Sequence, residues 1–333
     1  MATSQENPSF QYAHAVFAGG GVRGIAYVGA LEIAEQYGYR WASVAGTSAG
    51  AIVAALVAAG YTAQELAAIM RTIDYARFAA CPNHDLLYSA EVSNLLLCGG
   101  LHDGAYIEEF VREKLRVKGI ATFADLLVRE QAQNPNLFQR YRLTVIASDI
   151  THGQLVRLPQ DAHRYGLDPD ALDVARAVRM SASIPFFFVP IQLTDANGNT
   201  SCIVDGGLLS NFPLFLFEHA ATLQANPTPL PTFGFQLMDA SPQNTEQRTP
   251  CGLALLKALV TTMLSARDKL YSNEATFAHT IVIPTHDITS THFELTPEQA
   301  QQLYLWGREA AVAFFGTRQE RGRENGSYWR NEV

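Results

Sequence analysis

The chain alternates short apolar runs with longer segments of helical periodicity. Runs typical of buried strands occupy residues 12–18, 40–45, 141–147, 155–158, 202–204, 232–238 and 280–283. Segments with a helical pattern occupy residues 25–37, 51–59, 63–73, 105–115, 170–180, 252–271 and 297–315. Strands that alternate with helices in this way predict a mainly parallel central sheet in a three-layer α/β/α sandwich.

The alternation continues without a convincing linker, internal repeat or low-complexity block. We therefore expect a single domain over residues 1–333, with a core at 12–316 and a frayed polar tail at 317–333. Residues 85–104 combine aliphatic side chains with a Gly-Gly break. That pattern fits either a buried helix or a lid over an apolar site.

The composition indicates a globular protein and argues against some classes of partner. The chain has 333 residues, of which 48% are hydrophobic, and a formal net charge of −8. It has no run of basic residues, so nucleic acid is not an expected partner. The four cysteines lie far apart without CxxC pairing, which is typical of free thiols in a reducing compartment.

The N-terminus and the hydropathy pattern predict a cytoplasmic protein. Residues 1–8 lack the basic and apolar regions of a secretory signal. No segment offers ~18 consecutive apolar residues, so any membrane contact is expected to be peripheral. The sequence leaves the oligomeric state open.

The strongest chemical motif is Gly46-Thr47-Ser48-Ala49-Gly50, where an apolar strand leads into a helix of small apolar residues. A serine nucleophile must project from a sharp strand-to-helix turn, and flanking glycines remove Cβ atoms that would crowd it. The N-terminus of the helix also favours negative charge that develops beside Ser48. Ser48 is therefore the candidate nucleophile, with Gly46 and Gly50 shaping its turn, although such a motif also arises by chance.

The first predicted strand ends in a glycine loop, Gly19–Gly24, that has two interpretations. It fits the Gly-x-Gly-x-x-Gly fingerprint of dinucleotide-binding folds, but those folds need a carboxylate at the end of the second strand, where Ser48 follows instead. Alternatively, the loop amides lie at the same sheet edge as Ser48 and form an oxyanion hole. Arg23 is expected to fix the loop, to form a salt bridge or to attract anionic head groups.

Three motifs together resemble the signatures of the patatin-like phospholipase family. They are Gly20-Gly21-x-Arg23-Gly24, Gly46-Thr47-Ser48-Ala49-Gly50 and Asp205-Gly206-Gly207, in the same order and at the same kinds of strand end. The stretch Ser181-Ala182-Ser183-Ile184-Pro185 is similar to one that the family carries before its aspartate. The resemblance spans about residues 14–215.

The resemblance implies a lipid acyl hydrolase with a Ser-Asp dyad. Ser48 would be the nucleophile and Asp205 its base, and the backbone of Gly20, Gly21, Val22 and Arg23 would bind the oxyanion. No metal or organic cofactor is implied. The implied substrate is a phospholipid or another acyl-ester lipid. Burial would raise the pKa of Asp205 and make it a better base.

A Ser-Asp-His triad, as in α/β-hydrolases, remains an alternative because four histidines follow Asp205. These are His219, His279, His286 and His292, and none has a distinctive local setting. A hydrophobic acyl pocket is expected near Ser48. Five phenylalanines are candidates for this pocket or for ordinary core packing: Phe186, Phe187, Phe188, Phe212 and Phe215.

Overall fold

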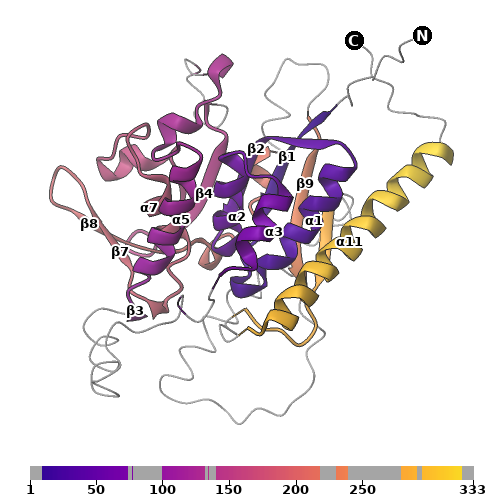
Figure 1. Cartoon of the computed structure of the whole chain (residues 1–333). Helices are drawn as coiled ribbons and strands as arrows, with labels where there is room; N and C mark the ends of the chain where they lie inside the picture. The colour runs from indigo at the N-terminus through magenta and orange to yellow at the C-terminus, as the bar shows by residue number, and fades with distance from the viewer. Residues whose placement is uncertain are drawn as a thin grey trace.

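A mixed β-sheet runs through the molecule, and helices pack along it (Figure 1). The computed structural model describes residues 10–73, 77, 100–131, 134, 140–217, 230–238, 279–290 and 295–324. In this part of the chain the sheet has eight strands. In spatial order they are β10 (Thr280–Pro284), β9 (Thr232–Met238), β1 (Gln11–Phe17), β2 (Tyr39–Thr47), β4 (Leu143–Asp149), β8 (Thr200–Asp205) and β7 (Ile191–Thr194), with β5 (Gln154–Leu158) also paired to β4.

The five strands from β10 to β4 are parallel, whereas β8, β7 and β5 pair antiparallel to their neighbours. The predicted α/β class with a mainly parallel sheet is confirmed. A separate two-stranded ribbon joins β3 (Gly100–His102) to β6 (Phe186–Phe188). The parallel order places the ends of β1 and β2 at one edge, because the carboxyl ends of parallel strands coincide.

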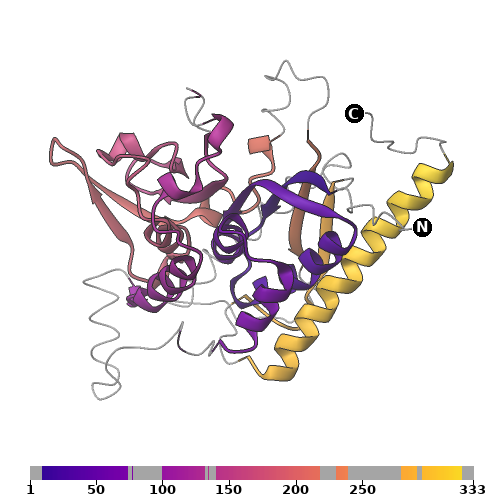
Figure 2. The same cartoon turned by 45° about the horizontal axis from the view of Figure 1, so that its top comes forward.

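The described α-helices are α1 (Ile25–Gln36), α2 (Ala49–Ala58), α3 (Ala63–Met70), α5 (Ala105–Val117), α7 (Val174–Ser181) and α11 (Pro297–Glu324). Short 3-10 helices span Gly21–Gly24, Phe123–Leu126, Arg129–Gln131, Ala162–Tyr165 and Gly206–Leu208. Figure 2 shows α11 lying along α1, on the side of the molecule away from the β7–β8 hairpin. Their backbones touch, since a Cβ at Gly29 would lie 2.0 Å from the Tyr304 carbonyl oxygen and one at Gly307 would lie 1.8 Å from that of Ala26.

Both faces of the central strands are buried, as expected of a parallel sheet. Alternate residues of β1, Ala15 and Phe17, pack into the main core with α1 and α2. Val16 points to the other face and packs in a second cluster with Phe212 and Leu214. The sheet therefore has a layer of helices on one face, and the segment with Phe212 and Leu214 covers the other. The helix predicted at 252–271 lies outside the described residues.

The largest differences between predicted and observed boundaries are at two helices. The helix predicted from residue 170 begins at Val174, because the Asp173 side chain accepts the Arg176 N–H as an N-cap and Asp170 instead binds Arg140 and Tyr141. The predicted tail from residue 317 continues α11 as far as Glu324. Gly316 stands at the predicted end, but its φ is not positive, so it does not form a left-handed C-cap and the helix passes through it.

Candidate active site

Ser48 lies on the turn between β2 and α2. Its backbone has φ 55° and ψ −124°, a conformation that a residue with a side chain rarely adopts. Such a conformation costs about 1–3 kcal/mol and occurs where the surrounding structure enforces it, often at functional sites. The turn matches the strand–turn–helix geometry of a nucleophile elbow.

Gly46 and Gly50 allow this turn because other backbone segments pass very close to them. A Cβ at Gly46 would lie 2.3 Å from the Gly50 carbonyl oxygen. One at Gly50 would lie 2.4 Å from the carbonyl oxygen of Phe17, at the end of the neighbouring strand β1. Any side chain at either position would collide with backbone, so the glycines are required by packing as well as by the turn.

Asp205 ends β8 and faces Ser48. One carboxylate oxygen, Oδ1, accepts the Gly207 N–H at 2.7 Å. The other, Oδ2, is buried and has no partner of normal hydrogen-bond geometry in the described part of the chain. Burial raises the pKa of Asp205 to about 6. The Ser48 side chain and the Gly207 N–H lower this pKa, but by less than burial raises it. The Ser48 side chain is therefore near enough to favour the ionised carboxylate, although no hydrogen bond of ordinary geometry joins it to Oδ2.

Strand β4 places the two residues within reach of each other. Its residue Ile146 pairs with Thr47 of β2, and the adjacent Ala147 pairs with Asp205 of β8. Because β8 is antiparallel to β4, Asp205 reaches the level of Ser48 from the opposite direction. Gly206 then lies against β4, where a Cβ would come within 2.2 Å of the Ile146 carbonyl oxygen.

The glycine loop forms a 3-10 turn beside Ser48, and its four predicted residues differ in what they bind. The Val22 N–H donates to the Ser290 carbonyl at 3.1 Å. The N–H groups of Gly20 and Gly21 have no hydrogen-bond acceptor among the residues that the structure describes. Arg23 fixes the loop, since its Nε donates to the Gly20 carbonyl at 3.2 Å and its Nη1 to Thr285 Oγ1 at 3.2 Å.

An apolar pocket opens between this loop and the helices. Ser48 lies in its wall, and the other lining side chains are almost all hydrophobic. They are Val22, Ile25, Ala49, Ile52, Val53, Met70, Ile73, Ile107, Phe110, Ala182, Ile184 and Phe188. A site of this kind suits a hydrocarbon chain whose polar end lies at Ser48.

Of the five predicted phenylalanines, Phe188 lines this pocket and Phe212 belongs to the core cluster on the far face of the sheet. Phe215 packs against that far cluster, and Phe187 packs beside Phe188. Phe110 of α5 also lines the pocket and was not among the phenylalanines predicted from the sequence. Its position in a helix with a strongly one-sided apolar face is the feature that could have indicated it.

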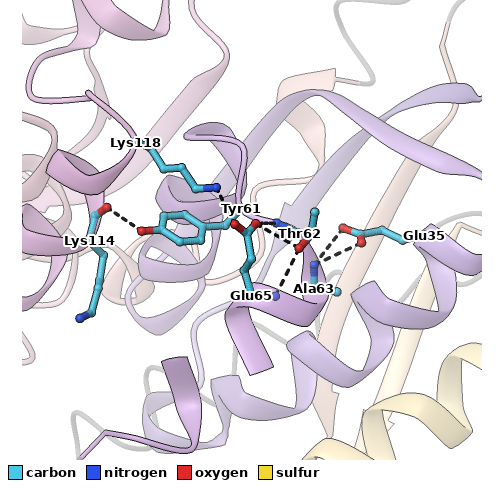
Figure 3. Close-up of polar contacts among 7 residues, drawn as sticks. All are labelled: Glu35, Tyr61, Thr62, Ala63, Glu65, Lys114 and Lys118. Carbon is cyan, nitrogen blue, oxygen red and sulfur yellow. Dashed lines mark hydrogen bonds and ion pairs between the residues drawn. The ribbon is translucent and has the colours of Figure 1, made fainter. Parts of the chain in front are cut away.

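Helix α3, which forms one pocket wall, is anchored at its N-terminus (Figure 3). Thr62 and Glu65 form a capping box. Both carboxylate oxygens of Glu35, from α1, accept the Ala63 N–H at 3.1 and 3.2 Å. Burial raises the pKa of Glu35 although the Ala63 N–H lowers it.

The same end of α3 is tied to the C-terminal end of α5 (Figure 3). Lys118 Nζ lies 2.7 Å from Glu65 Oε1 and 4.5 Å from the centre of the Tyr61 ring. The Tyr61 hydroxyl donates to the Lys114 carbonyl at 2.8 Å. These contacts join α3 and α5 at one end, while Met70 and Ile107, toward the other ends of the two helices, line the pocket.

Two of the four alternative triad histidines lie in described segments. His279 precedes β10, at the sheet edge opposite to the one where Ser48 follows β2. His286 follows β10 and packs against Trp306, with ring centres 4.4 Å apart and ring planes tilted by 53°. Neither lines the Ser48 pocket. His219 and His292 lie outside the described residues, as does most of the 85–104 segment.

The described residues contain no cluster of three or more His, Cys, Asp or Glu side chains arranged to hold a metal ion. Every described helix is too short or too polar to span a bilayer. The one described cysteine, Cys202, is a free thiol.

Residues 15–217 match the family described as patatin-like phospholipase. The chain belongs to this family. Membership of the patatin-like phospholipases supports a hydrolase that acts on lipid acyl esters. The matched segment contains the glycine loop, Ser48 and Asp205.

The chain is also similar to three known proteins. An uncharacterized Bacillus subtilis protein, YqhO, is 38% identical over 308 residues, which cover 91% of this chain and 98% of YqhO. The probable lipid hydrolase 463L of Invertebrate iridescent virus 6 is 28% identical over 203 residues, covering 61% of this chain and 62% of the viral protein. The crystal structure of VipD from Legionella pneumophila shares the fold with a TM-score of 0.53 at 17% identity, covering 93% of this chain and 68% of VipD.

Proposed function

We propose that this patatin-like protein hydrolyses acyl esters of lipids through a Ser48-Asp205 dyad. The observation that carries the proposal is the pairing of a serine on a positive-φ turn with a buried, under-coordinated carboxylate, at the mouth of an apolar pocket. Phospholipids or other acyl-ester lipids are the proposed substrates, and a cytoplasmic enzyme with peripheral membrane contact is the setting proposed for it.

In the first step, Asp205 accepts the Ser48 hydroxyl proton while Ser48 Oγ attacks the ester carbonyl. A pKa of about 6 suits this task, because the carboxylate is ionised near neutral pH yet more basic than an ordinary aspartate. The leaving alcohol takes the proton and an acyl-enzyme remains. Water, deprotonated by Asp205, then attacks the acyl carbonyl, and the proton passes to Ser48 Oγ as the fatty acid leaves.

The glycine loop supplies the proposed oxyanion hole. The N–H groups of Gly20 and Gly21 are the best-placed donors because nothing in the described residues accepts their hydrogen bonds. The Val22 N–H would contribute only after releasing the Ser290 carbonyl. The Arg23 side chain holds the turn, and each oxyanion donor is worth about 3 kcal/mol of transition-state stabilisation.

A serine-reactive fluorophosphonate tests the nucleophile. We expect it to label one peptide that contains Ser48, and we expect Ser48→Ala to lose both labelling and hydrolysis of p-nitrophenyl butyrate. Ser43→Ala, on the same strand β2, is the matched control and should keep both. A folded Ser48→Ala protein with full turnover would refute the proposal.

The alternatives give different results. A triad enzyme would lose several orders of magnitude on replacing one of His219, His279, His286 or His292 by Gln, whereas the dyad predicts mild effects. A nucleotide-binding protein that uses Gly19–Gly24 would bind NAD or FAD tightly and would not react with the phosphonate.

A further inference from the structure

Residues Ser181 to Ser183, where α7 ends, contact both members of the proposed dyad through hydrogen bonds. Ser181 and Ser183 are fully buried. They belong to the stretch that resembles a family sequence, but no chemical role follows from their position along the chain. Their hydrogen bonds to Ser48 and Asp205 indicate such a role.

The Ser181 hydroxyl binds the backbone of the Ser48 turn. The Ser48 N–H donates to Ser181 Oγ at 2.9 Å, and Ser181 Oγ donates to the Ile146 carbonyl of β4. Ser48 precedes α2, so its N–H has no partner within that helix and needs another acceptor when buried. One hydroxyl therefore satisfies the strained turn and ties it to the central strand.

Ser183 binds the backbone of the other dyad residue. Its carbonyl accepts the Asp205 N–H at 2.8 Å. Its hydroxyl donates to the Arg179 carbonyl at 2.7 Å and accepts from the Arg179 guanidinium. A single residue, Ala182, therefore separates the acceptor for the Ser48 N–H from the acceptor for the Asp205 N–H.

Arg179 holds this segment in place. Its side chain is 1% exposed and donates also to the carbonyls of Asp103 and Val189. Among the described residues it forms no ion pair. Burial lowers the pKa of Arg179 to about 10, so the buried guanidinium still carries its charge at neutral pH.

We propose that Ser181 and Ser183 are positioning residues that set the distance between Ser48 and Asp205. This inference rests on the proposed dyad. Its physical basis is that each dyad residue is held through its backbone N–H by this segment, while Asp205 Oδ2 has no hydrogen bond of ordinary geometry, so a small shift of either backbone changes whether the proton can pass. A misplacement of about 1 Å at a reacting centre can cost about 100-fold in rate.

The isosteric pair Ser181→Thr and Ser181→Val isolates the hydroxyl, because both add the same volume and only Thr keeps the oxygen. With p-nitrophenyl butyrate as substrate, we expect Val to lower kcat by about 10- to 100-fold with little change in KM, and Thr to restore most of it. The rate of fluorophosphonate labelling at Ser48 should fall in parallel with kcat.

Ser181→Ala adds no volume and decides the matter if the Val variant fails to fold. We expect Ala to lower kcat at least tenfold, again with KM little changed. Thr144→Val is the matched control: it removes a buried hydroxyl of β4 that accepts from Gln160 Nε2 at 2.9 Å, and kcat should stay unchanged. A wild-type kcat in Ser181→Ala, or no advantage of Thr over Val, would overturn the inference.

Ser48→Ala run in parallel separates this inference from the proposed function. If Ser48→Ala is active, the dyad itself is wrong. If Ser48→Ala is inactive while Ser181→Ala is fully active, the dyad stands and the positioning role alone fails.

Discussion

Two aspartates on neighbouring strands expose almost no surface to solvent and yet have opposite pKa shifts. Asp149 ends β4 and is 1% exposed, and Asp205 ends β8 and is 2% exposed. Burial favours the protonated form of both. For Asp149, however, hydrogen bonds from His152, Tyr165 and Thr151 outweigh burial and lower the pKa below its usual value. For Asp205, burial outweighs two donors and raises the pKa to about 6.

Depth and the number of donors both contribute to the difference: Asp149 lines a hollow with Thr151 and His152 and accepts several hydrogen bonds, whereas Asp205 lies deeper and accepts fewer. Asp149 accepts the N–H groups of Thr151 and His152, the His152 Nδ1 hydrogen at 2.8 Å and the Tyr165 hydroxyl at 3.1 Å. Asp205 keeps Oδ2 without a normal partner. A fully satisfied carboxylate is stable but weakly basic, whereas an under-satisfied one retains basicity at a cost in stability.

The largest expected difference between the two aspartates is in turnover. Asp205→Asn keeps the shape of the site but cannot accept the Ser48 proton, so we expect kcat to fall at least about 10³-fold, nearly as far as in Ser48→Ala. The double variant should be little worse, because the two residues act as a unit. Asp149→Asn, assayed as folded protein, should stay within about tenfold of wild type. Comparable losses in both variants would remove the distinction between them.

Much of the site was predictable from sequence because it depends on local patterns. The turn at Ser48 and the glycine loop are short segments whose glycines directly indicate sharp turns and close approach. Strand β9 has the predicted bounds 232–238, since an apolar run between polar segments defines it without reference to neighbours.

Features that depend on distant partners could not be predicted in the same way. The antiparallel direction of β8 depends on its pairing with β4. The acceptor for the Val22 N–H is Ser290, and the acceptor for the Ser48 N–H is the Ser181 hydroxyl, 133 residues away. No local pattern of hydrophobic and polar residues encodes such contacts, because each requires the assembled fold.

The second prediction concerns the pH dependence of the reaction. The base must be ionised, so kcat/KM should fall as the pH drops below about 6, by about tenfold per pH unit. The rate of fluorophosphonate labelling should show the same limb. In Asp149→Asn the limb should remain near pH 6, because that carboxylate does not act on Ser48. If the pH at which the rate falls shifts in Asp149→Asn, the titrating group would be Asp149 and the assignment to Asp205 would be wrong.

The third prediction concerns stability, where the sign follows from the raised pKa of Asp205. Between the usual value of 3.8 and about 6, the folded protein binds a proton at Asp205 that the unfolded chain does not, so the contribution of this carboxyl to stability rises as the pH falls from about 6 toward 4. Asp205→Asn removes the buried charge and should raise the free energy of unfolding at pH 8 by about 3 kcal/mol, with the advantage disappearing near pH 4. Urea unfolding at several pH values measures this. A destabilised Asp205→Asn at pH 8 would contradict it.

Asp149 should behave in the opposite way. Its lowered pKa means that the ionised form stabilises the fold above the unfolded pKa, and this contribution is lost as the pH falls through the lower folded value. Asp149→Asn leaves donors from His152 and Tyr165 poorly paired and should lower the free energy of unfolding at pH 7 by about 1–3 kcal/mol. Equal or greater stability of this variant at pH 7 would show that the four donors do not stabilise the carboxylate.

The smallest effect is expected at Glu65, which has donors like those of Asp149 but lies in solvent. Lys118 and the Thr62 N–H lower the pKa of Glu65, whose side chain is 45% exposed. Water screens its charge, so the ion pair with Lys118 should contribute less than about 1 kcal/mol. Glu65→Gln can keep the capping box with Thr62 while losing the ion pair, which makes it the appropriate variant. We expect a small loss in urea unfolding that shrinks further in high salt and is absent in a Lys118→Met background. If Glu65→Gln lowered the free energy of unfolding as much as Asp149→Asn, burial would not increase the contribution of a carboxylate to stability. Its hydrogen-bond donors alone would then set that contribution.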